Sequence, residues 1–132
     1  MASPLQGIAR EADEMLITVL KSKLHSAAVT AGDVNYQGSL GVSRELMDAV
    51  GFVPYEKILI ANITNGERLE TYVIPEDKPG QIILNGAAAH KGKIGDRVIV
   101  MSFAQLYAEE VEGYRPRVAV LNAKNEIVEL RS

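Results

Sequence analysis

Residues 57–74 read KILIANITNGERLETYVI, two β-prone runs on either side of an Asn-Gly pair. Asn65-Gly66 is a strong signal for a type I′ turn, in which both central residues need a positive φ. The segment therefore predicts a β-hairpin with strands over 57–63 and 69–74. Side chains alternate along a strand, so Arg68, Glu70 and Tyr72 are expected to share one face and Thr71 to point to the other.

Further short β-prone runs lie on both sides of this hairpin. They cover residues 16–20 with continuation through Leu24, 27–30, 81–84, 97–101, 118–121 and 127–130. Helical character is expected at 43–50, where Ser43 can act as the N-cap and Gly51 fits the left-handed position after the end, and at 104–112. Many short strands separated by turns favour a mainly β fold, a small barrel or sandwich. Periodicity alone does not choose among small barrels.

Length and composition limit the function classes. A chain of 132 residues suits one domain with one core, expected over 15–132 after a flexible leader at 1–14, in which 8–15 forms a short helix or stays disordered. A net charge of −3 gives no electrostatic case for nucleic acid. No run of roughly 18 apolar residues predicts a membrane span. The absence of cysteine excludes disulfides and thiol catalysis, and with no apolar signal core it fits a cytoplasmic protein.

The dipeptide Gly38-Ser39 is the first candidate for chemistry. Glycine permits unusual backbone angles and close approach to its carbonyl, so the Ser39 hydroxyl can reach the Gly38 carbonyl carbon. Taken alone, the pair is more often a loop turn, because both residues are common turn formers.

The surrounding motifs favour a reactive Gly38-Ser39 bond over a simple loop turn, because together they resemble the pyruvoyl-dependent aspartate 1-decarboxylases. The resemblance covers roughly residues 15–121. Its motifs, in order along the chain, are Lys23-Leu24-His25, Tyr36-Gln37-Gly38-Ser39, Asn62-Ile63-Thr64-Asn65-Gly66, Arg68, Thr71-Tyr72, Asn85-Gly86-Ala87-Ala88-Ala89-His90 and Gly95-Asp96. The family implies a six-stranded double-psi β-barrel with short capping helices, assembled as a homotetramer with sites at subunit boundaries.

The resemblance also implies self-cleavage between residues 38 and 39. In the family, Ser39 attacks the Gly38 carbonyl, elimination releases residues 1–38, and the new terminus becomes a pyruvoyl cofactor. Thr71 resembles a residue that assists this processing, and Tyr36 is expected to help hold the processing loop. The residues do not decide whether cleavage is spontaneous or needs a maturation factor.

The implied reaction converts L-aspartate to β-alanine and carbon dioxide, a step in pantothenate and coenzyme A supply. The pyruvoyl group forms a Schiff base with the substrate, without a metal. Tyr72 resembles the proton donor, and Arg68 and Lys23 resemble carboxylate binders. The other residues implied to line the site are His25, Asn85, Gly86, Ala87 and Ala88.

Each of these residues also has an ordinary structural interpretation. Arg68 and Lys23 are otherwise solvated charges, Tyr72 a packed strand tyrosine and His25 a structural histidine. Two rival functions follow. A non-enzymatic small barrel would keep an intact backbone, and a pyruvoyl enzyme for another amino acid would keep the chemistry. Because two cationic side chains favour a substrate with two carboxylates, aspartate leads and glutamate is the competitor.

Overall fold

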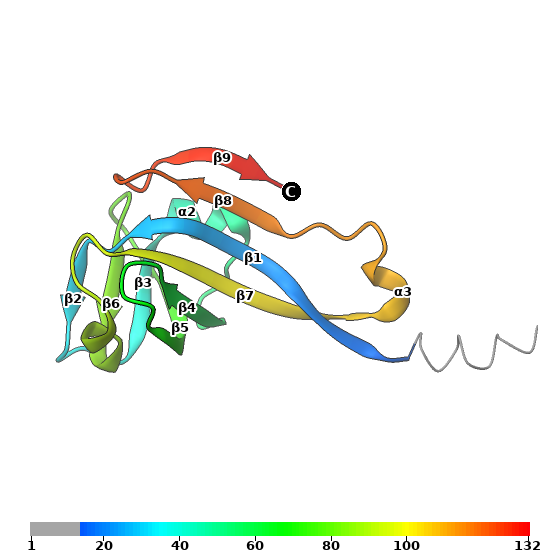
Figure 1. Cartoon of the computed structure of the whole chain (residues 1–132), viewed down its shortest axis with the longest axis horizontal. Coiled ribbons are helices and arrows are strands. Elements are labelled where there is room, and N and C mark those ends of the chain that lie inside the picture. Colours follow the sequence, from blue (N-terminus) through cyan, green and yellow to red (C-terminus); the bar gives the residue numbers. More distant parts are fainter. Residues whose placement is uncertain (1–13) are drawn as a thin grey trace, which may run out of the picture.

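The computed structural model describes residues 14–132, which form one curled nine-stranded sheet with short helices (Figure 1). The strands are β1 (Leu16–Ala28), β2 (Ala31–Asp33), β3 (Ser39–Ser43), β4 (Lys57–Asn62), β5 (Arg68–Glu76), β6 (Ile82–Asn85), β7 (Arg97–Tyr107), β8 (Arg117–Leu121) and β9 (Ile127–Arg131). The helical segments are α2 (Arg44–Val50), the 3-10 segment η1 (Gly86–Lys91) and α3 (Ala108–Val111). The mainly β fold with short helices is confirmed, and a small barrel fits it, although the sheet has nine strands where six were expected.

Strand β5 lies between β3 and β4 and joins the part of the sheet that contains β3 to the part that contains β4. Its first half pairs with β4 in an antiparallel register that sets Tyr72 opposite Lys57 and Arg68 opposite Ala61. Its second half pairs with β3 in a parallel register that begins with Leu40 opposite Val73. Tyr72 therefore lies where one ladder ends and the other begins.

Strand β1 is the longest element and is bonded on both sides. It pairs with β7 from Leu16 opposite Tyr107 to Ala28 opposite Arg97, and its middle also pairs with β8 (Figure 1). The segment that follows β1 forms a hydrogen bond with β6, near the other end of the sheet. In this bond the Thr30 N–H donates to the Ile82 carbonyl at 2.8 Å. These bonds bend the sheet around a single hydrophobic core.

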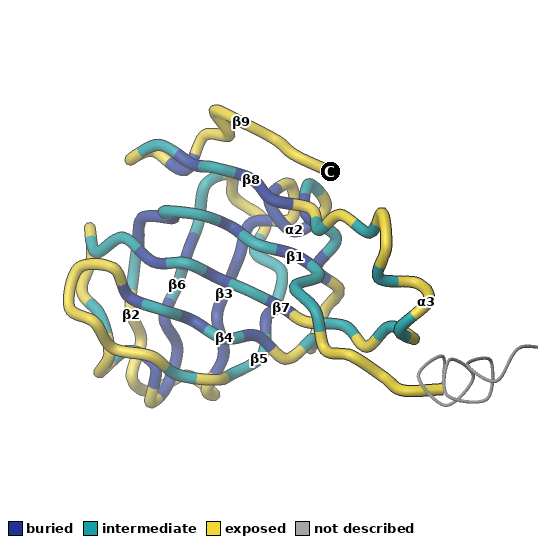
Figure 2. The backbone as a smooth tube through the Cα atoms, turned by 45° about the vertical axis from the view of Figure 1, so that its right-hand side comes forward, coloured by how far each residue is buried: buried dark blue, intermediate teal, exposed yellow. Residues whose placement is uncertain are grey.

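Apolar side chains from the inner face of the sheet fill this core. The largest fully buried ones are Leu24, Leu40, Leu46, Ile58, Ile60, Ile82, Leu84, Val42, Val50, Val73, Val98 and Val100. Buried backbone lies in the middle of the molecule, whereas β9 is exposed along its length (Figure 2). The core therefore packs against the inner faces of β3, β5 and β6.

The hairpin over 57–74 is confirmed, but its turn is longer than the predicted type I′ turn. Asn65 does not have a positive φ; only Gly66 does, at +79°. The buried side chain of Asn62 organises the loop instead, because its Oδ1 accepts from the N–H groups of Thr64 at 2.9 Å and Asn65 at 3.2 Å. Its Nδ2 donates to Asp96 Oδ2 at 3.0 Å. These tertiary bonds favour the longer loop.

Three other expectations need correction or fall outside the described part. Residues 27–30 are not a separate strand, because β1 continues through Ala28 past a bulge in which Ser26 has a φ of +66°. Residues 104–107 are strand rather than helix, because β7 pairs there with the start of β1. The leader at 1–14 and the helix at 8–15 fall almost wholly outside the described residues. The domain boundaries stay a prediction.

The predicted helix at 43–50 is confirmed as α2, although Ser43 makes no side-chain cap bond to it. Gly51 takes the left-handed conformation at φ +80° after its end. Within residues 14–132, no helix is long and apolar enough to cross a bilayer.

Candidate functional site

Ser39 is the first residue of β3, and its side chain is held in a buried position. The residue is only 1% exposed. Its hydroxyl accepts a hydrogen bond from Asn85 Nδ2 at 3.1 Å and donates to the Gln37 carbonyl at 3.2 Å. Ser39 and Asn85 are direct partners in the β3–β6 ladder, so strand pairing sets this contact.

The peptide before Ser39 lies against a second glycine. Gly86 has a φ of +63°, and a β-carbon on it would meet both Gly38 Cα and Gly38 N at 2.7 Å. It would also meet the Tyr36 carbonyl oxygen at 2.9 Å. By contrast, a β-carbon on the exposed Gly38 would have no neighbour within 4 Å. The chain therefore approaches Gly86 closely while the other side of Gly38 stays open.

The predicted proton-transfer residue, Tyr72, lies beside Ser39. Thr71, the predicted processing residue, precedes Tyr72 on β5 and pairs with Ile58 of β4. Leu40 pairs with Val73 in the parallel β3–β5 register, and Ser39 and Tyr72 directly precede this pair. A pocket of about 260 Å³ opens here. It is lined by Tyr36, Gln37, Ser39, Tyr55, Tyr72, Ile74 and Pro75.

The small residues after Asn85 allow close packing beside Ser39. Asn85 and Gly86 are buried, and η1 begins at Gly86. Ala88 is buried and packs into the core, whereas Ala87 is exposed. Absence of larger side chains lets η1 pack close to β2 and β3.

The three expected cationic or imidazole residues do not line this pocket within one chain. Arg68 precedes Tyr72 by four residues on β5, which is roughly 13 Å along a strand. Lys23 lies in a row of paired residues that runs through Met101 and Leu59 to Glu70. That row spans three strand spacings, roughly 14 Å along the sheet. Lys23, Arg68 and Tyr72 thus share the outer face of the sheet but stand apart.

Comparison with known proteins identifies the family of this arrangement. The aspartate decarboxylase family model matches residues 15–128. An aspartate 1-decarboxylase of Thermosipho africanus is 47% identical over 114 residues, covering 86% of this chain and 93% of the relative. Those of Thioalkalivibrio sulfidiphilus and Desulfotalea psychrophila are 49% and 48% identical, covering 86% and 88% of this chain and 91% and 98% of the relatives. The chain belongs to the aspartate decarboxylase family.

Within this member of the family, His25 sits in a positively charged environment on the outer side of β1. Its Nδ1 is buried and has no hydrogen-bond partner among the described residues. Burial lowers the pKa of His25 below its ordinary value of 6.5, and the charges of Lys23, Arg131 and Arg97 lower it further. His25 is therefore biased toward the neutral form.

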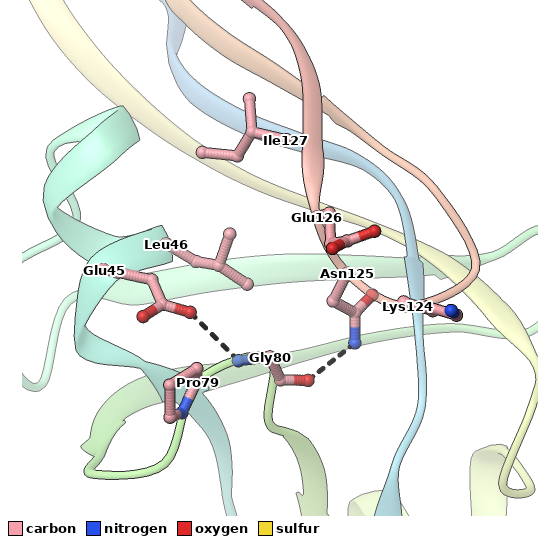
Figure 3. A pocket seen from close by; sticks show the side chains of 8 residues that line it. All are labelled: Glu45, Leu46, Pro79, Gly80, Lys124, Asn125, Glu126 and Ile127. Carbon is pink, nitrogen blue, oxygen red and sulfur yellow. Dashed lines mark hydrogen bonds between the residues drawn. The ribbon is translucent and has the colours of Figure 1, made fainter.

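A second pocket, of about 410 Å³, lies between α2 and the turn before β9 (Figure 3). Two of its polar side chains, Glu45 and Asn125, already bond to backbone. Glu45 accepts from Gly80 N–H at 3.0 Å, and Asn125 Nδ2 donates to the Gly80 carbonyl at 2.8 Å (Figure 3). These contacts secure the loop before β6, and the pocket contains none of the residues that the family resemblance singled out.

Tyr55 and Gln37 join the site in the structure but were not among the predicted site residues. Gln37 belongs to a matched motif, and its carbonyl accepts the Ser39 hydroxyl hydrogen. Tyr55 precedes β4, and its ring lies 5.9 Å from the ring of Tyr72, centroid to centroid. No local pattern marks Tyr55, because the contact depends on how the loop before β4 folds over β5.

Proposed function

We propose that this chain is an aspartate 1-decarboxylase that converts L-aspartate to β-alanine and carbon dioxide after cleaving itself between Gly38 and Ser39. The observation that carries the proposal is the Ser39 hydroxyl, buried and held by Asn85, directly after an open glycine. The proposal includes a cytoplasmic enzyme that supplies β-alanine for pantothenate synthesis, as the family resemblance implies.

Self-cleavage would begin with attack of Ser39 Oγ on the Gly38 carbonyl carbon. The peptide C–N bond breaks and an ester forms, with the serine nitrogen becoming a free amine. Elimination then removes the Cα proton of residue 39 and breaks its Cβ–O bond, leaving a carboxylate on Gly38 and dehydroalanine at position 39. Addition of water and loss of ammonia gives the pyruvoyl terminus. The hydroxyl of Thr71, which precedes Tyr72 on β5, would help orient the scissile carbonyl.

The residues around Ser39 fit a pyruvoyl group at this position. The group is small. Because Gly86 has no β-carbon, the backbone at Gly38 can lie close to the backbone of Gly86, where a β-carbon would collide with it. Asn85 Nδ2, which donates to Ser39 Oγ in the uncleaved chain, would donate to a carbonyl oxygen there instead. A pyruvoyl group supplies an electron sink for carbon dioxide loss. Tyr72 lines the same pocket and would deliver a proton to the substrate carbon.

Substrate carboxylates would be held by Arg68 and Lys23, with His25 nearby. The planar guanidinium of Arg68 suits a two-point carboxylate contact. These residues share the outer face of the sheet with Tyr72 but do not line its pocket in one chain. We therefore include a homotetramer in the proposal, with each site completed across a subunit boundary.

The outer face supplies a physical reason for such assembly. A pocket of about 440 Å³ on it is lined by Leu59 and Phe103 among others, and Phe103 is 44% exposed. Leu16, also on the long β1–β7 pair, is 49% exposed. A second copy that covered this apolar surface would remove it from water.

The deciding experiment is intact mass spectrometry of the purified protein under denaturing conditions. The proposal expects two fragments, residues 1–38 and a pyruvoyl-capped 39–132, and one uncleaved mass for Ser39→Ala. Carbon dioxide release from L-aspartate should accompany cleavage and be absent in the variant. A processed protein that prefers glutamate would correct the substrate only. A wild-type chain that stays intact after prolonged warming, with or without cell extract containing maturation factors, would overturn the proposal.

A further inference from the structure

Tyr55 combines an unusual backbone conformation with a place in the Ser39 pocket. Its φ is +70°, a region that residues with a β-carbon rarely adopt and that is an outlier for bulky side chains such as tyrosine. It nevertheless lines the pocket that contains Ser39 and Tyr72, although 75% of its surface is exposed. Hydrophobic burial of Tyr55 itself therefore does not account for the conformation.

The conformation is maintained by bonds on both sides of the residue. The Tyr55 N–H donates to the Val73 carbonyl at 2.8 Å, and the Val73 N–H donates to the Glu56 carbonyl at 3.0 Å. The Glu56 carboxylate in turn accepts from Val53 N–H at 3.0 Å and from Lys21 Nζ at 3.0 Å. The loop before β4 is thus fastened to β5 at the residue that follows Tyr72.

This fastening determines where the two aromatic rings meet. The centroids of Tyr55 and Tyr72 are 5.9 Å apart and the ring planes are tilted by 41°. Separations of roughly 4.5–7 Å with tilted planes are favourable for aromatic pairs. The Tyr72 ring is attached to β5 at one end and contacts Tyr55 on its flank, so fewer of its rotamers remain accessible.

We propose that Tyr55 is a positioning residue that fixes the Tyr72 ring beside position 39. The inference rests on the proposed function, in which Tyr72 donates the proton. Tyr55 pairs with the Tyr72 ring, whereas the hydrogen bonds of the Ser39 hydroxyl go to Gln37 and Asn85. We therefore expect Tyr55 to act on the rate of proton delivery and not on the chemistry of cleavage. A strained backbone at this residue is retained because it places the ring.

The test uses full-length wild-type protein and three substitutions, with L-aspartate as substrate and rates normalised to the cleaved fraction measured by intact mass. Tyr55→Asn removes the ring while tolerating the left-handed backbone, and Tyr55→Gly does so with still less strain. Tyr55→Phe keeps the ring. Melting temperatures of all variants are compared, and those of Tyr55→Asn and Tyr55→Gly are expected to equal or exceed that of the wild type.

The expected result is a fall in kcat of roughly 2- to 13-fold for Tyr55→Asn and Tyr55→Gly, the range that corresponds to one aromatic pair. KM should stay within about twofold, since an effect confined to the transition state leaves it unchanged. Tyr55→Phe should restore kcat. In a Tyr72→Phe background, Tyr55→Asn should cause no further loss, because the hydroxyl it positions is gone.

The opposing results are distinct. Wild-type kcat in Tyr55→Asn, failure of Tyr55→Phe to restore it, or an equal loss in the Tyr72→Phe background would overturn the positioning role while leaving the decarboxylase intact. A rise in KM alone would make Tyr55 a wall of the substrate pocket instead. Wild-type protein with neither cleavage nor turnover would overturn the proposed function and this inference with it.

Discussion

Gly86 lies so close to Gly38 that a β-carbon on Gly86 would sit 2.7 Å from the Gly38 nitrogen. The contact joins the start of η1 to the peptide that precedes Ser39. Gly38 and Gly86 are 48 residues apart in the chain, and the neighbouring hydrogen bond between Asn85 and Ser39 spans 46 residues. The geometry of the proposed cleavage bond thus depends on a residue that takes no part in the chemistry.

Replacing Gly86 with alanine should therefore slow self-cleavage. Forcing extra atoms into a packed position costs about 1–3 kcal/mol. If that cost falls on the reactive geometry, cleavage slows by roughly 5- to 150-fold. Gly66→Ala is the matched control, because Gly66 has a similar φ of +79° but a β-carbon there has no neighbour within 4 Å. Intact mass followed over time gives both rates, and equal rates would refute the role of the contact.

Substituting Asn85 should also slow cleavage, for a different reason. Asn85→Ala removes the donor to Ser39 Oγ, and Asn85→Asp keeps the shape but not the N–H. A hydrogen bond of ordinary strength contributes about 0.5–1.5 kcal/mol, so a loss of roughly 2- to 13-fold in rate is expected for either variant. If Asn85→Asp cleaved at the wild-type rate while Asn85→Ala did not, packing rather than donation would be the cause.

Two inactive variants should restore activity when they assemble together. Ser39→Ala cannot form the pyruvoyl group, and Arg68→Ala lacks the proposed carboxylate binder. Because Arg68 does not line the Ser39 pocket of its own chain, mixed oligomers would contain some sites with both functions intact. Co-expression followed by native mass spectrometry and an L-aspartate assay tests this. Mixed oligomers without activity would place both residues at the same chain's site.

Asn62 should be important for stability rather than for chemistry. It is 3% exposed, and its side chain forms four hydrogen bonds. Two are accepted from N–H groups of the hairpin loop, and two are donated to the Lys91 carbonyl and to Asp96. Asn62→Ala leaves buried groups without partners, which costs about 1–3 kcal/mol. Urea denaturation measures the loss. Asn65→Ala in the exposed part of the same loop is the control and should cost less, and equal costs would contradict the assignment.

Acidification should destabilise the fold through His25. Its pKa is lowered in the folded protein, chiefly by burial and then by Lys23, Arg131 and Arg97. Below its ordinary value of 6.5, the unfolded chain takes up a proton that the folded chain resists, so stability falls as the pH drops toward the lower folded-state pKa. The melting temperature of His25→Asn should change less than that of the wild type between about pH 7.5 and 5.5. An equal change would assign the effect to other groups.

The fold was most predictable where its determinants are local. The hairpin at 57–74 follows from β-prone runs around Asn65-Gly66, and α2 follows from apolar spacing that ends at Gly51. The full length of β1 was not predictable, because its bulge at Ser26 and its pairing with β7 depend on residues 69 to 91 positions away. The same pairing makes 104–107 a strand against its local helical character.

The candidate site was predictable in part for the same reason. Ser39, Asn85 and Tyr72 came from separated motifs, and the structure brings all three together. Alternation along β5 correctly indicated that Arg68 and Glu70 share an exposed face. Tyr55 was missed because its contact with Tyr72 arises from a loop whose left-handed residue has no local signature.

The position of β1 between β7 and β8 has a consequence for the chain after processing. The cut would separate residues 1–38 covalently, yet β1 would remain bonded to strands on both sides. Each processed unit would be a complex of two peptides held by a shared sheet. Its melting temperature would depend on protein concentration, and recovery from denaturation would require two fragments to find each other. The intact precursor is then the form in which the fold assembles as one chain.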